Sequence, residues 1–405
     1  MHRIPRTVSR LALLSGALFL AISAAAQTTG GIQGRVTDDQ GAPLPGVGVE
    51  AKSPALQGSR IATTGGDGRY HLELLPPGDY AVAFTLAGFA KQSQTGVSVA
   101  LAKETTLSIS MKIAVSAEVT VTGEAPVVDT TTTSIGTNLD NRQVETLPTG
   151  RNYASIAQVV PGVSSDATTN SSGGDPDTKT ISVYGSSGAE NSFYIDGVNT
   201  TGSEYGFQGK NLNYEFIQAV DVKTGGYEAE YGRATGGVIN VITKSGGNEF
   251  HGDAFGYYDN DSLQRSADSV VSTGGTSAGF TKKDFGLDLG GYFLKDKLWF
   301  FGAYDKVKNT QKTRLDVCDP GAAPTPCGAG QTARSINVAT DSDRDLASAK
   351  LTFKITGSQS IIGTFFQDPR DDTGATLDAD HSVNGDPLTY QGLRSFGGKD
   401  FALRY

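Results

Sequence analysis

Two short patterns contain residue types that serve catalysis or metal binding in other proteins. Residues Gly275–Gly279 have the form G-x-S-x-G, the pattern around a hydrolase nucleophile, which requires a strand before the serine and a helix after it. The flanking residues VVSTGG and FTKKD predict a surface loop, so we interpret this match as chance. Asp341, Asp343 and Asp345 have the spacing that begins a calcium-binding loop. The sixth position is Leu346, where such a loop requires a turn glycine, so no calcium site is predicted.

The histidines, the charge balance and the remaining motifs exclude further classes of site. His71, His251 and His381 lie far apart, and none begins an H-x-x-E or H-E-x-x-H zinc pair. The chain contains neither a phosphate-binding loop nor a dinucleotide fingerprint. The formal net charge is −9 without a Lys/Arg-rich stripe, which excludes a basic nucleic-acid binder. We therefore expect no catalytic residue, cofactor, metal or nucleic-acid partner, and a protein that is not an enzyme.

The first 26 residues have the layout of a secretory signal peptide. Arg3, Arg6 and Arg10 supply a positive start, and the apolar stretch Leu11–Ile22 follows. Small residues at Ala24–Ala26 then suit a cleavage site. The apolar stretch is too short for a membrane-spanning helix. The pattern therefore predicts export, with cleavage after Ala26.

Export makes the two cysteines informative. Cys318 and Cys327 are the only cysteines and lie in the loop-like segment CDPGAAPTPC. In an oxidising compartment we expect them to form a disulfide, worth about 3 kcal/mol by loop entropy. No second cysteine pair or histidine lies nearby, so a zinc site is not predicted.

Residues 27–113 predict a small β-sandwich. The residues Tyr80, Val82, Phe84 and Leu86 alternate along one strand, and Gly66–Gly68 contains an Asp-Gly hairpin signal. The segments GRVTD, GAPLPGV, DGRY and LPPGDYAV resemble the carboxypeptidase regulatory-like domain, which has a transthyretin-like, carbohydrate-binding-like fold. The resemblance implies a binding or spacer module without catalysis.

Residues 114–134 form a Thr/Val-rich linker that contains one strand-prone run. Its residues are Glu118, Val119, Thr120, Val121 and Thr122. An exposed strand of this kind can add to the sheet edge of another protein through main-chain hydrogen bonds. The same run would also suit the last strand of the preceding sandwich, and from the residues alone both interpretations stay open.

Residues 135–248 predict a mixed α/β domain rich in glycine. Helices are expected over Tyr153–Val160 and Tyr214–Ala219. Strands are expected over Thr180–Tyr184, Phe193–Ile195, Ala219–Thr224 and Gly237–Thr243.

Three segments of this domain carry a second resemblance. They are LPTGRNYASIAQVVPGV (147–163), FYIDGVN (193–199) and EFIQAVDVKTGGYEAEYGRATGGVINVITKSGGNEFHG (215–252). Their sequences and order resemble the plug domain of TonB-dependent outer-membrane receptors, in the Oar-like branch. In such receptors an energy-coupling segment, the TonB box, precedes the plug. The resemblance therefore implies that Glu118–Thr122 contacts a TonB-type energy-transducing protein.

Residues 249–405 alternate between apolar and polar residues with a period of two. The alternation is clearest over Phe250–Tyr258, Asp284–Tyr292, Ser348–Ile355 and Phe401–Tyr405. Leu298–Lys308 and Ser360–Gln367 complete the set with a less clear register. Apolar-out, polar-in strands are typical of transmembrane β-barrels, so we expect outer-membrane lipid as a partner.

The connections between these strands alternate in length. Short turns are expected at 294–297 and 356–359, and long loops at 259–282, 309–346 and 368–398. Outer-membrane barrels are built this way, whereas a soluble sheet would not need the alternation. A barrel that encloses a plug has about 22 strands, so six strands are too few to form one. We therefore interpret the chain as a gene fragment or an interrupted reading frame.

The sequence thus predicts a mainly β protein: a β-sandwich, a mixed α/β plug domain and about six first strands of a transmembrane β-barrel. The resemblance implies energised uptake of a scarce large extracellular solute, such as a siderophore or a carbohydrate. A non-transporting binding or adhesion protein is the alternative. The sequence assigns no residue to a solute site.

Overall fold

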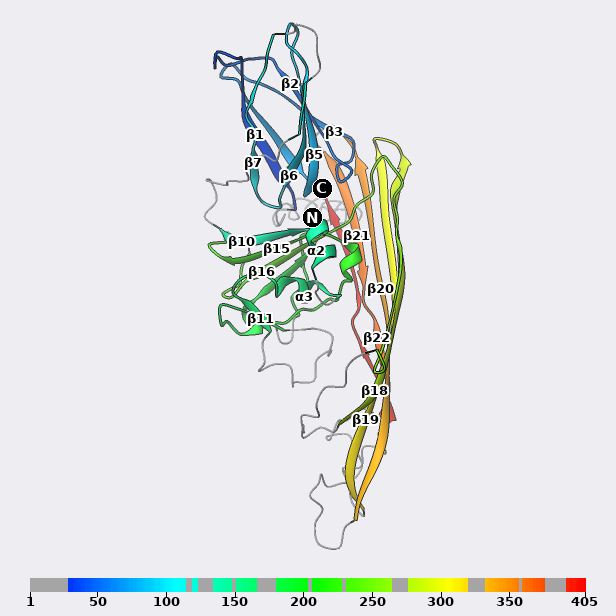
Figure 1. Cartoon of the computed structure of the whole chain (residues 1–405). Helices are drawn as coiled ribbons and strands as arrows, with labels where there is room; N and C mark the ends of the chain where they lie inside the picture. Colours follow the sequence, from blue (N-terminus) through cyan, green and yellow to red (C-terminus); the bar gives the residue numbers. More distant parts are fainter. Residues whose placement is uncertain are drawn as a thin grey trace, which may run out of the picture. The chain divides into compact units, whose positions relative to one another are not determined.

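The computed structural model describes most of the chain beyond its N-terminal segment (Figure 1). The described residues are 28–113, 119–122, 134–147, 151–165, 180–202, 206–227, 231–263, 276–319, 332–356, 359–375 and 391–405. The chain divides into two compact units, Met1–Gly209 with Ile217–Lys244, and Lys210–Phe216 with Ser245–Tyr405. The predicted signal peptide lies outside the described residues. Within the described ranges, no helix is long and apolar enough to cross a bilayer.

The predicted β-sandwich is confirmed. Its strands are β1 (Gly30–Thr37), β2 (Gly48–Lys52), β3 (Ser59–Thr63), β4 (Arg69–Leu75), β5 (Gly78–Thr85), β6 (Gln92–Val99), β7 (Glu104–Thr106), β8 (Ile109–Ser110) and β9 (Val119–Thr122). One sheet has the order β4-β1-β7, with β8 also paired to β1, and the other has the order β3-β2-β5-β6-β9. Tyr80, Val82 and Phe84 are buried between the sheets, as their alternation predicts. The Tyr70 ring packs edge-on against Phe84 with 5.6 Å between centroids.

The predicted hairpin at Gly66–Gly68 is wrong in its strand pairing. The turn itself forms, because the Gly65 N–H donates to the Arg69 carbonyl at 2.9 Å. However, β3 pairs with β2, whereas β4 pairs with β1 in the other sheet. A turn sequence specifies a local chain reversal, but distant ladder partners determine which sheet each strand joins.

The plug-like part of the first unit contains a five-stranded sheet of order β10-β15-β16-β13-β14. These strands are β10 (Ile135–Asp140), β13 (Ser192–Ile195), β14 (Val198–Asn199), β15 (Ile217–Gly225) and β16 (Val238–Thr243). A separate pair joins β11 (Val163–Ser165) to β12 (Ile181–Val183). The helices are α2 (Asn141–Thr146) and α3 (Tyr153–Ala157), and the second confirms the start of the helix expected there.

The helix expected over Tyr214–Ala219 is wrong. A single 3-10 turn, η2 (Tyr214–Phe216), is followed directly by β15. From Ile217 onward the backbone pairs with β16 on one edge and, from Ala219, with β10 on the other. Pairing on both edges and burial of Val220 and Val222 outweigh a short helical preference.

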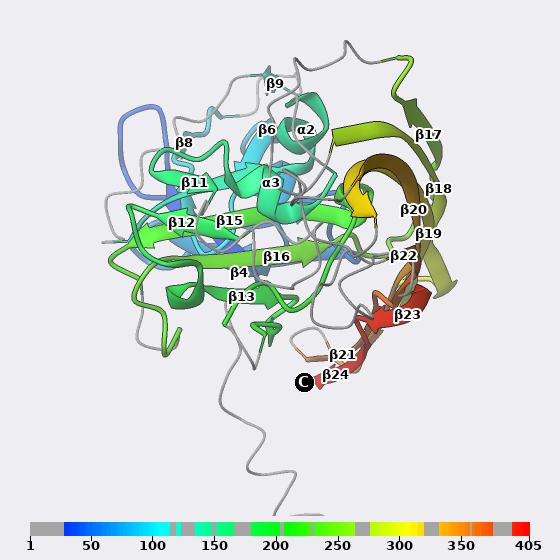
Figure 2. The same ribbon diagram turned by 90° about the horizontal axis from the view of Figure 1, so that it is seen from below.

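The second unit is a curved antiparallel wall of strands, three of which have 19 to 23 residues (Figure 2). They are β17 (Ala254–Asn260), β18 (Thr276–Leu294), β19 (Leu298–Asp319), β20 (Thr332–Lys354), β21 (Ser360–Gln367), β22 (Arg370–Ala375), β23 (Gln391–Phe396) and β24 (Lys399–Arg404). Both β21 and β22 pair with β20, and β24 and β23 pair with them in turn. The described strands therefore follow six paths, as predicted, and the pairing order leaves the barrel open between β17 and β24.

Much of the sequence expected to form long loops is strand. β19 runs to Asp319 and β20 begins at Thr332, within the loop expected over 309–346. β22 and β23 likewise occupy much of the loop expected over 368–398. These parts carry polar residues on both faces, so the apolar period disappears although the main-chain ladder continues. The two short turns predicted at 294–297 and 356–359 lie where expected, between β18 and β19 and between β20 and β21.

Two neighbouring strand paths are interrupted at the same level. Asp368 and Pro369 separate β21 from β22, and Gly397 and Gly398 separate β23 from β24. The Asp368 N–H donates to the Gly398 carbonyl at 3.1 Å. Gly397 has a φ of +78°, and a Cβ there would lie 2.1 Å from the Asp368 carbonyl oxygen, so glycine is required.

Candidate functional site

The run predicted to be the coupling segment lies at the edge of the sandwich. Residues Val119–Thr122 form β9, which pairs in parallel with Gln92–Thr95 of β6. β9 is the last strand of its sheet within the described residues. Glu118 lies outside the described residues. The run thus occupies the place expected of a last sandwich strand, and its contact with a TonB-type protein stays a prediction.

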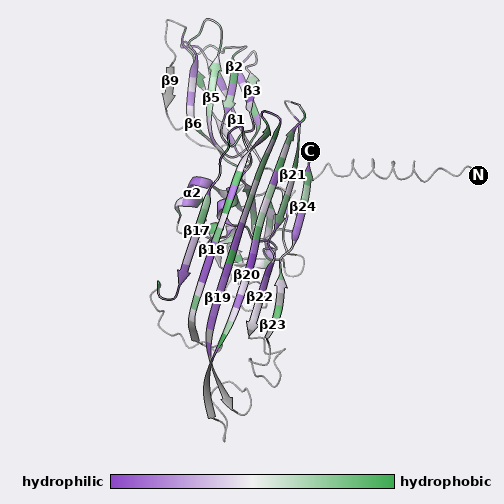
Figure 3. Ribbon diagram, turned by 90° about the vertical axis from the view of Figure 1, so that its right-hand side faces the viewer, coloured by the Kyte–Doolittle hydropathy of each residue, from purple (hydrophilic) through white to green (hydrophobic). Residues whose placement is uncertain are grey.

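The wall has an inverted polarity, which means that its buried face is polar and its exposed face is apolar, the reverse of a water-soluble sheet. One face of β18 to β20 buries charged side chains, including Asp288, Asp305 and Lys350, with Asp305 fully inaccessible. The opposite face exposes large apolar side chains such as Leu289 and Phe353, and Leu403 of β24 is 79% exposed. Hydrophobic and hydrophilic residues alternate along these strands (Figure 3). A polar inner face and an apolar outer face are typical of a membrane barrel rather than of a water-soluble sheet.

The exposed apolar residues form a band of limited height. Along β19 and β20 the band extends from Leu298 and its partner Phe353 to Tyr304 and its partner Ala347. Six residues of strand correspond to roughly 20 Å, close to the ~25 Å of an outer-membrane apolar band. Lys306 follows on the same face, and the strand continues to Asp319. The strands are therefore much longer than a bilayer requires.

The segment Lys210–Phe216 packs on the polar face of the wall, and we call its contacts the wall clamp. The Lys210 ammonium lies 3.0 Å from a carboxylate oxygen of Asp368 and 3.0 Å from one of Asp400. The main-chain N–H groups of Asn211 and Gly398 donate to the two oxygens of Asp368 at 2.8 and 3.0 Å. Burial alone would lower the pKa of Lys210, but Asp368 and Asp400 outweigh it, so the pKa is raised.

Two further contacts complete the wall clamp. The Asn213 side-chain amide donates to the buried Asp305 carboxylate. The Tyr214 and Tyr257 hydroxyls share a hydrogen bond of 2.7 Å. No sequence motif marks this segment, because its partners lie between 43 residues (Tyr214 to Tyr257) and 190 residues (Lys210 to Asp400) away along the chain. The sequence placed Asp368 in a surface loop, whereas the structure buries it.

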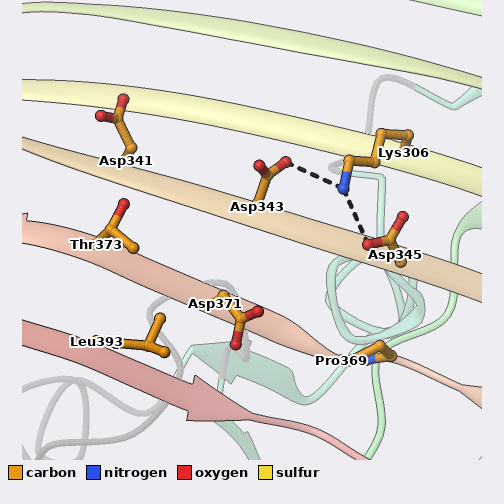
Figure 4. A pocket seen from close by; sticks show the side chains of 8 residues that line it. All are labelled: Lys306, Asp341, Asp343, Asp345, Pro369, Asp371, Thr373 and Leu393. Atoms are coloured by element: carbon orange, nitrogen blue, oxygen red, sulfur yellow. Dashed lines mark hydrogen bonds and ion pairs between the residues drawn. The ribbon is translucent and has the colours of Figure 1, made fainter.

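A pocket of about 290 Å³ lies beside β19, β20 and β22 in the same unit (Figure 4). Half of its lining residues are acidic: it is lined by Lys306, Asp341, Asp343, Asp345, Pro369, Asp371, Thr373 and Leu393. Lys306 bridges Asp343 at 3.2 Å and Asp345 at 2.9 Å. Along β20 these carboxylates share the alternation of the exposed residues Leu351 and Phe353, so the pocket opens on the outer face.

The described residues include neither a metal-binding cluster nor both cysteines of the predicted disulfide. Among the described residues, no group of three His, Cys, Asp or Glu side chains is placed to hold a metal ion. Cys318 lies near the end of β19, and Cys327 lies outside the described residues, so their disulfide stays a prediction. Of the G-x-S-x-G pattern, only Gly275 lies outside the described residues, and Thr276 to Gly279 belong to β18 rather than to the predicted surface loop or to a helix. A helix after the serine is what a nucleophile would require.

Three family models match successive parts of the chain. The carboxypeptidase regulatory-like domain matches residues 31–112, and the TonB-dependent receptor plug domain matches residues 128–238. An outer membrane β-barrel domain matches residues 242–325. The three matches have the order sandwich, plug and barrel that the sequence predicts.

Three similar proteins are a TonB-dependent transporter, an outer membrane transporter and a siderophore receptor. The TonB-dependent transporter Oar of Myxococcus xanthus is 33% identical over 319 residues, which are 75% of this chain and 29% of Oar. The outer membrane transporter YddB of Escherichia coli is 19% identical with a TM-score of 0.48, over 66% of this chain and 36% of YddB. The siderophore receptor PirA of Acinetobacter baumannii is 20% identical with a TM-score of 0.41, over 66% of this chain and 37% of PirA. The chain thus spans less than a third of the length of Oar. Given the three domain matches and the identity to Oar, the chain belongs to the TonB-dependent receptors of the outer membrane.

Proposed function

We propose that this chain supplies the coupling segment, the plug and the first barrel strands of an energised importer. The importer would take a scarce large solute from outside the cell into the periplasm. The observation that carries this proposal is the inverted polarity of the wall, which buries Asp305 and exposes Leu403. A wall of this kind separates lipid from a polar lumen, and the plug domain fills such a lumen in this family.

The coupling step would use the main chain of the segment Glu118–Thr122. A TonB-type energy-transducing protein adds a strand to this segment and pulls on it, which moves the plug and opens a path. Strand addition depends on backbone N–H and C=O groups rather than on side chains. The step should therefore tolerate most substitutions in the segment but not proline, which lacks an N–H.

The substitution Val121→Pro tests this coupling step, with Val121→Ala as the matched control. In the protein expressed from its own gene, Val121→Pro should abolish accumulation of the solute in the periplasm while leaving binding at the cell surface unchanged. Val121→Ala should retain both. If uptake survives the proline, the coupling segment lies elsewhere.

The solute class is proposed only coarsely, as a siderophore, an oligosaccharide or a compound of similar size. The carbohydrate-binding-like sandwich favours one second candidate, a binding or adhesion protein that never transports. The two differ in energy dependence, because only an importer accumulates solute against a gradient. Equal accumulation with and without a proton-motive force would favour the binding protein.

A further inference from the structure

The sandwich holds the proposed coupling segment as a strand of its own sheet. β9 pairs in register with β6, with Val119 opposite Gln92, Thr120 opposite Ser93 and Val121 opposite Gln94. The sheet continues inward through β5 and β2. A segment that must pair with a partner protein is therefore already extended and fixed in register by this chain.

The outer edge of β9 remains open to a further strand. Along a β-strand the N–H and C=O groups of successive residues point to opposite edges, so pairing with β6 engages only alternate residues. The other main-chain groups of the four residues point away from β6. Within the described residues, no strand pairs with that edge.

The composition of β9 contrasts with that of other edge strands in the sandwich. Natural edge strands resist unwanted pairing through charged side chains, proline or bulges. β4 carries Arg69, His71 and Glu73, and β3 carries Arg60. β9 has the sequence Val-Thr-Val-Thr and carries none of these protective features. Its edge is thus built to accept a strand.

We propose that the sandwich presents β9 to the energy-transducing protein, whose strand continues the sheet on the open edge as β5-β6-β9-partner. The proposal rests on the proposed function, in which Glu118–Thr122 is the coupling segment. Ordering an unstructured segment opposes strand addition, and pairing with β6 removes part of that entropy cost in advance. The partner strand adds to the open edge without displacing β9 from β6.

A cross-link tests whether β9 stays on β6 while the partner binds. The pair Ser93→Cys and Thr120→Cys lies in register, and Ser93 is on the opposite face from the buried Gln92 and Gln94. The native Cys318 and Cys327 are changed to serine in every variant. The control pair, Ser98→Cys with Thr120→Cys, is out of register, since Ser98 lies beyond the paired residues of β6.

The probe is the purified periplasmic domain of the TonB-type protein encoded in the same genome, bound to the receptor in detergent-solubilised outer membranes. We expect a disulfide in the in-register pair only, and the oxidised protein should bind the probe at least as tightly as the reduced protein. A loss of binding of about tenfold or more on oxidation would show that β6 competes with the partner, and would overturn the proposal.

Two other results would also overturn the proposal, and they are distinguishable. Failure of the in-register pair to cross-link would show that β9 does not lie on β6, whatever the result with Val121→Pro. Cross-linking without probe binding in either redox state would show that the pairing is real but that the coupling segment is misassigned, which also refutes the proposed coupling step.

Discussion

At the scale of single residues, Lys210 supplies the cation of the wall clamp. Its side chain is 12% exposed and lies between Asp368, which is 8% exposed, and Asp400. Two main-chain donors also hold Asp368. Asp400 is 39% exposed, whereas Asp368 is buried, so removing the cation leaves the buried Asp368 carboxylate without its counter-charge.

The substitution Lys210→Met should destabilise the wall clamp by about 3 kcal/mol, because breaking a buried ion pair costs more than the pair contributes. The measurement is protease sensitivity of the segment around residue 210 in outer membranes. Lys308→Met is the matched control, because Lys308 is 57% exposed and its contact with Asp343 is 3.5 Å long. Equal sensitivity of the two variants would show that the clamp does not hold the segment.

A second residue-scale prediction concerns the turn between β3 and β4. Gly68 has a φ of +75°, and a Cβ there would lie 2.5 Å from the Val36 carbonyl oxygen. Gly68→Ala should therefore cost about 2 kcal/mol or more through backbone strain and collision. Gly66→Ala is the control, because a Cβ at Gly66 meets nothing within 4 Å.

Hydrogen exchange of the β1 and β4 amides measures the effect of these two substitutions. Faster exchange in Gly68→Ala and native exchange in Gly66→Ala are expected. Native exchange in both variants would mean that the turn adjusts without strain.

At the scale of elements, the sequence predicts strands well where one face is apolar. The alternation around Phe285, Leu351 and Leu403 exists because lipid-facing and lumen-facing residues have opposite polarity. Where the strands continue beyond the band, polar residues lie on both faces and the alternation is lost from the sequence, although the ladder between β19 and β20 continues to Asp319. These parts form strands because their main chain pairs with a distant strand, although the local sequence has no alternation that predicts one.

The other errors of prediction have the same origin. The turn at Gly66–Gly68 was predictable from its residues, but the sheet that each flanking strand joins was not. η2 became a single turn because Ile217 begins a strand that distant partners pair on both edges. The wall clamp could not be predicted either, because Lys210 and Asp368 are 158 residues apart and neither belongs to a motif.

At the scale of the whole molecule, the outward apolar band predicts that the cost of a charged substitution depends on its depth in the membrane. Leu351 is exposed and its partner Phe300 lies within the band, so Leu351→Lys places a charge against lipid. The cost near the middle of the bilayer is about 2–4 kcal/mol. Thr373→Lys is the control, because Thr373 is exposed on β22 beyond the band.

Assembly into the outer membrane measures this difference. The folded fraction of Leu351→Lys, read from its resistance to unfolding in cold detergent, should fall clearly below that of Thr373→Lys. Equal folded fractions would argue that the apolar face does not contact lipid.

The interruption at Asp368–Pro369 and Gly397–Gly398 has a consequence for how such a receptor can change over generations. It separates the membrane-embedded segments β21 and β24 from β22 and β23, which continue the same two strand paths beyond the apolar band. The register of β21 is set by pairing with β20, and that of β24 by pairing with β21 and by the bond from the Gly398 N–H to the Asp368 carboxylate. Insertions and substitutions in β22 and β23 therefore leave the membrane-embedded strands β21 and β24 unchanged. The outermost surface of such receptors can diverge between relatives while the membrane-spanning strands are retained.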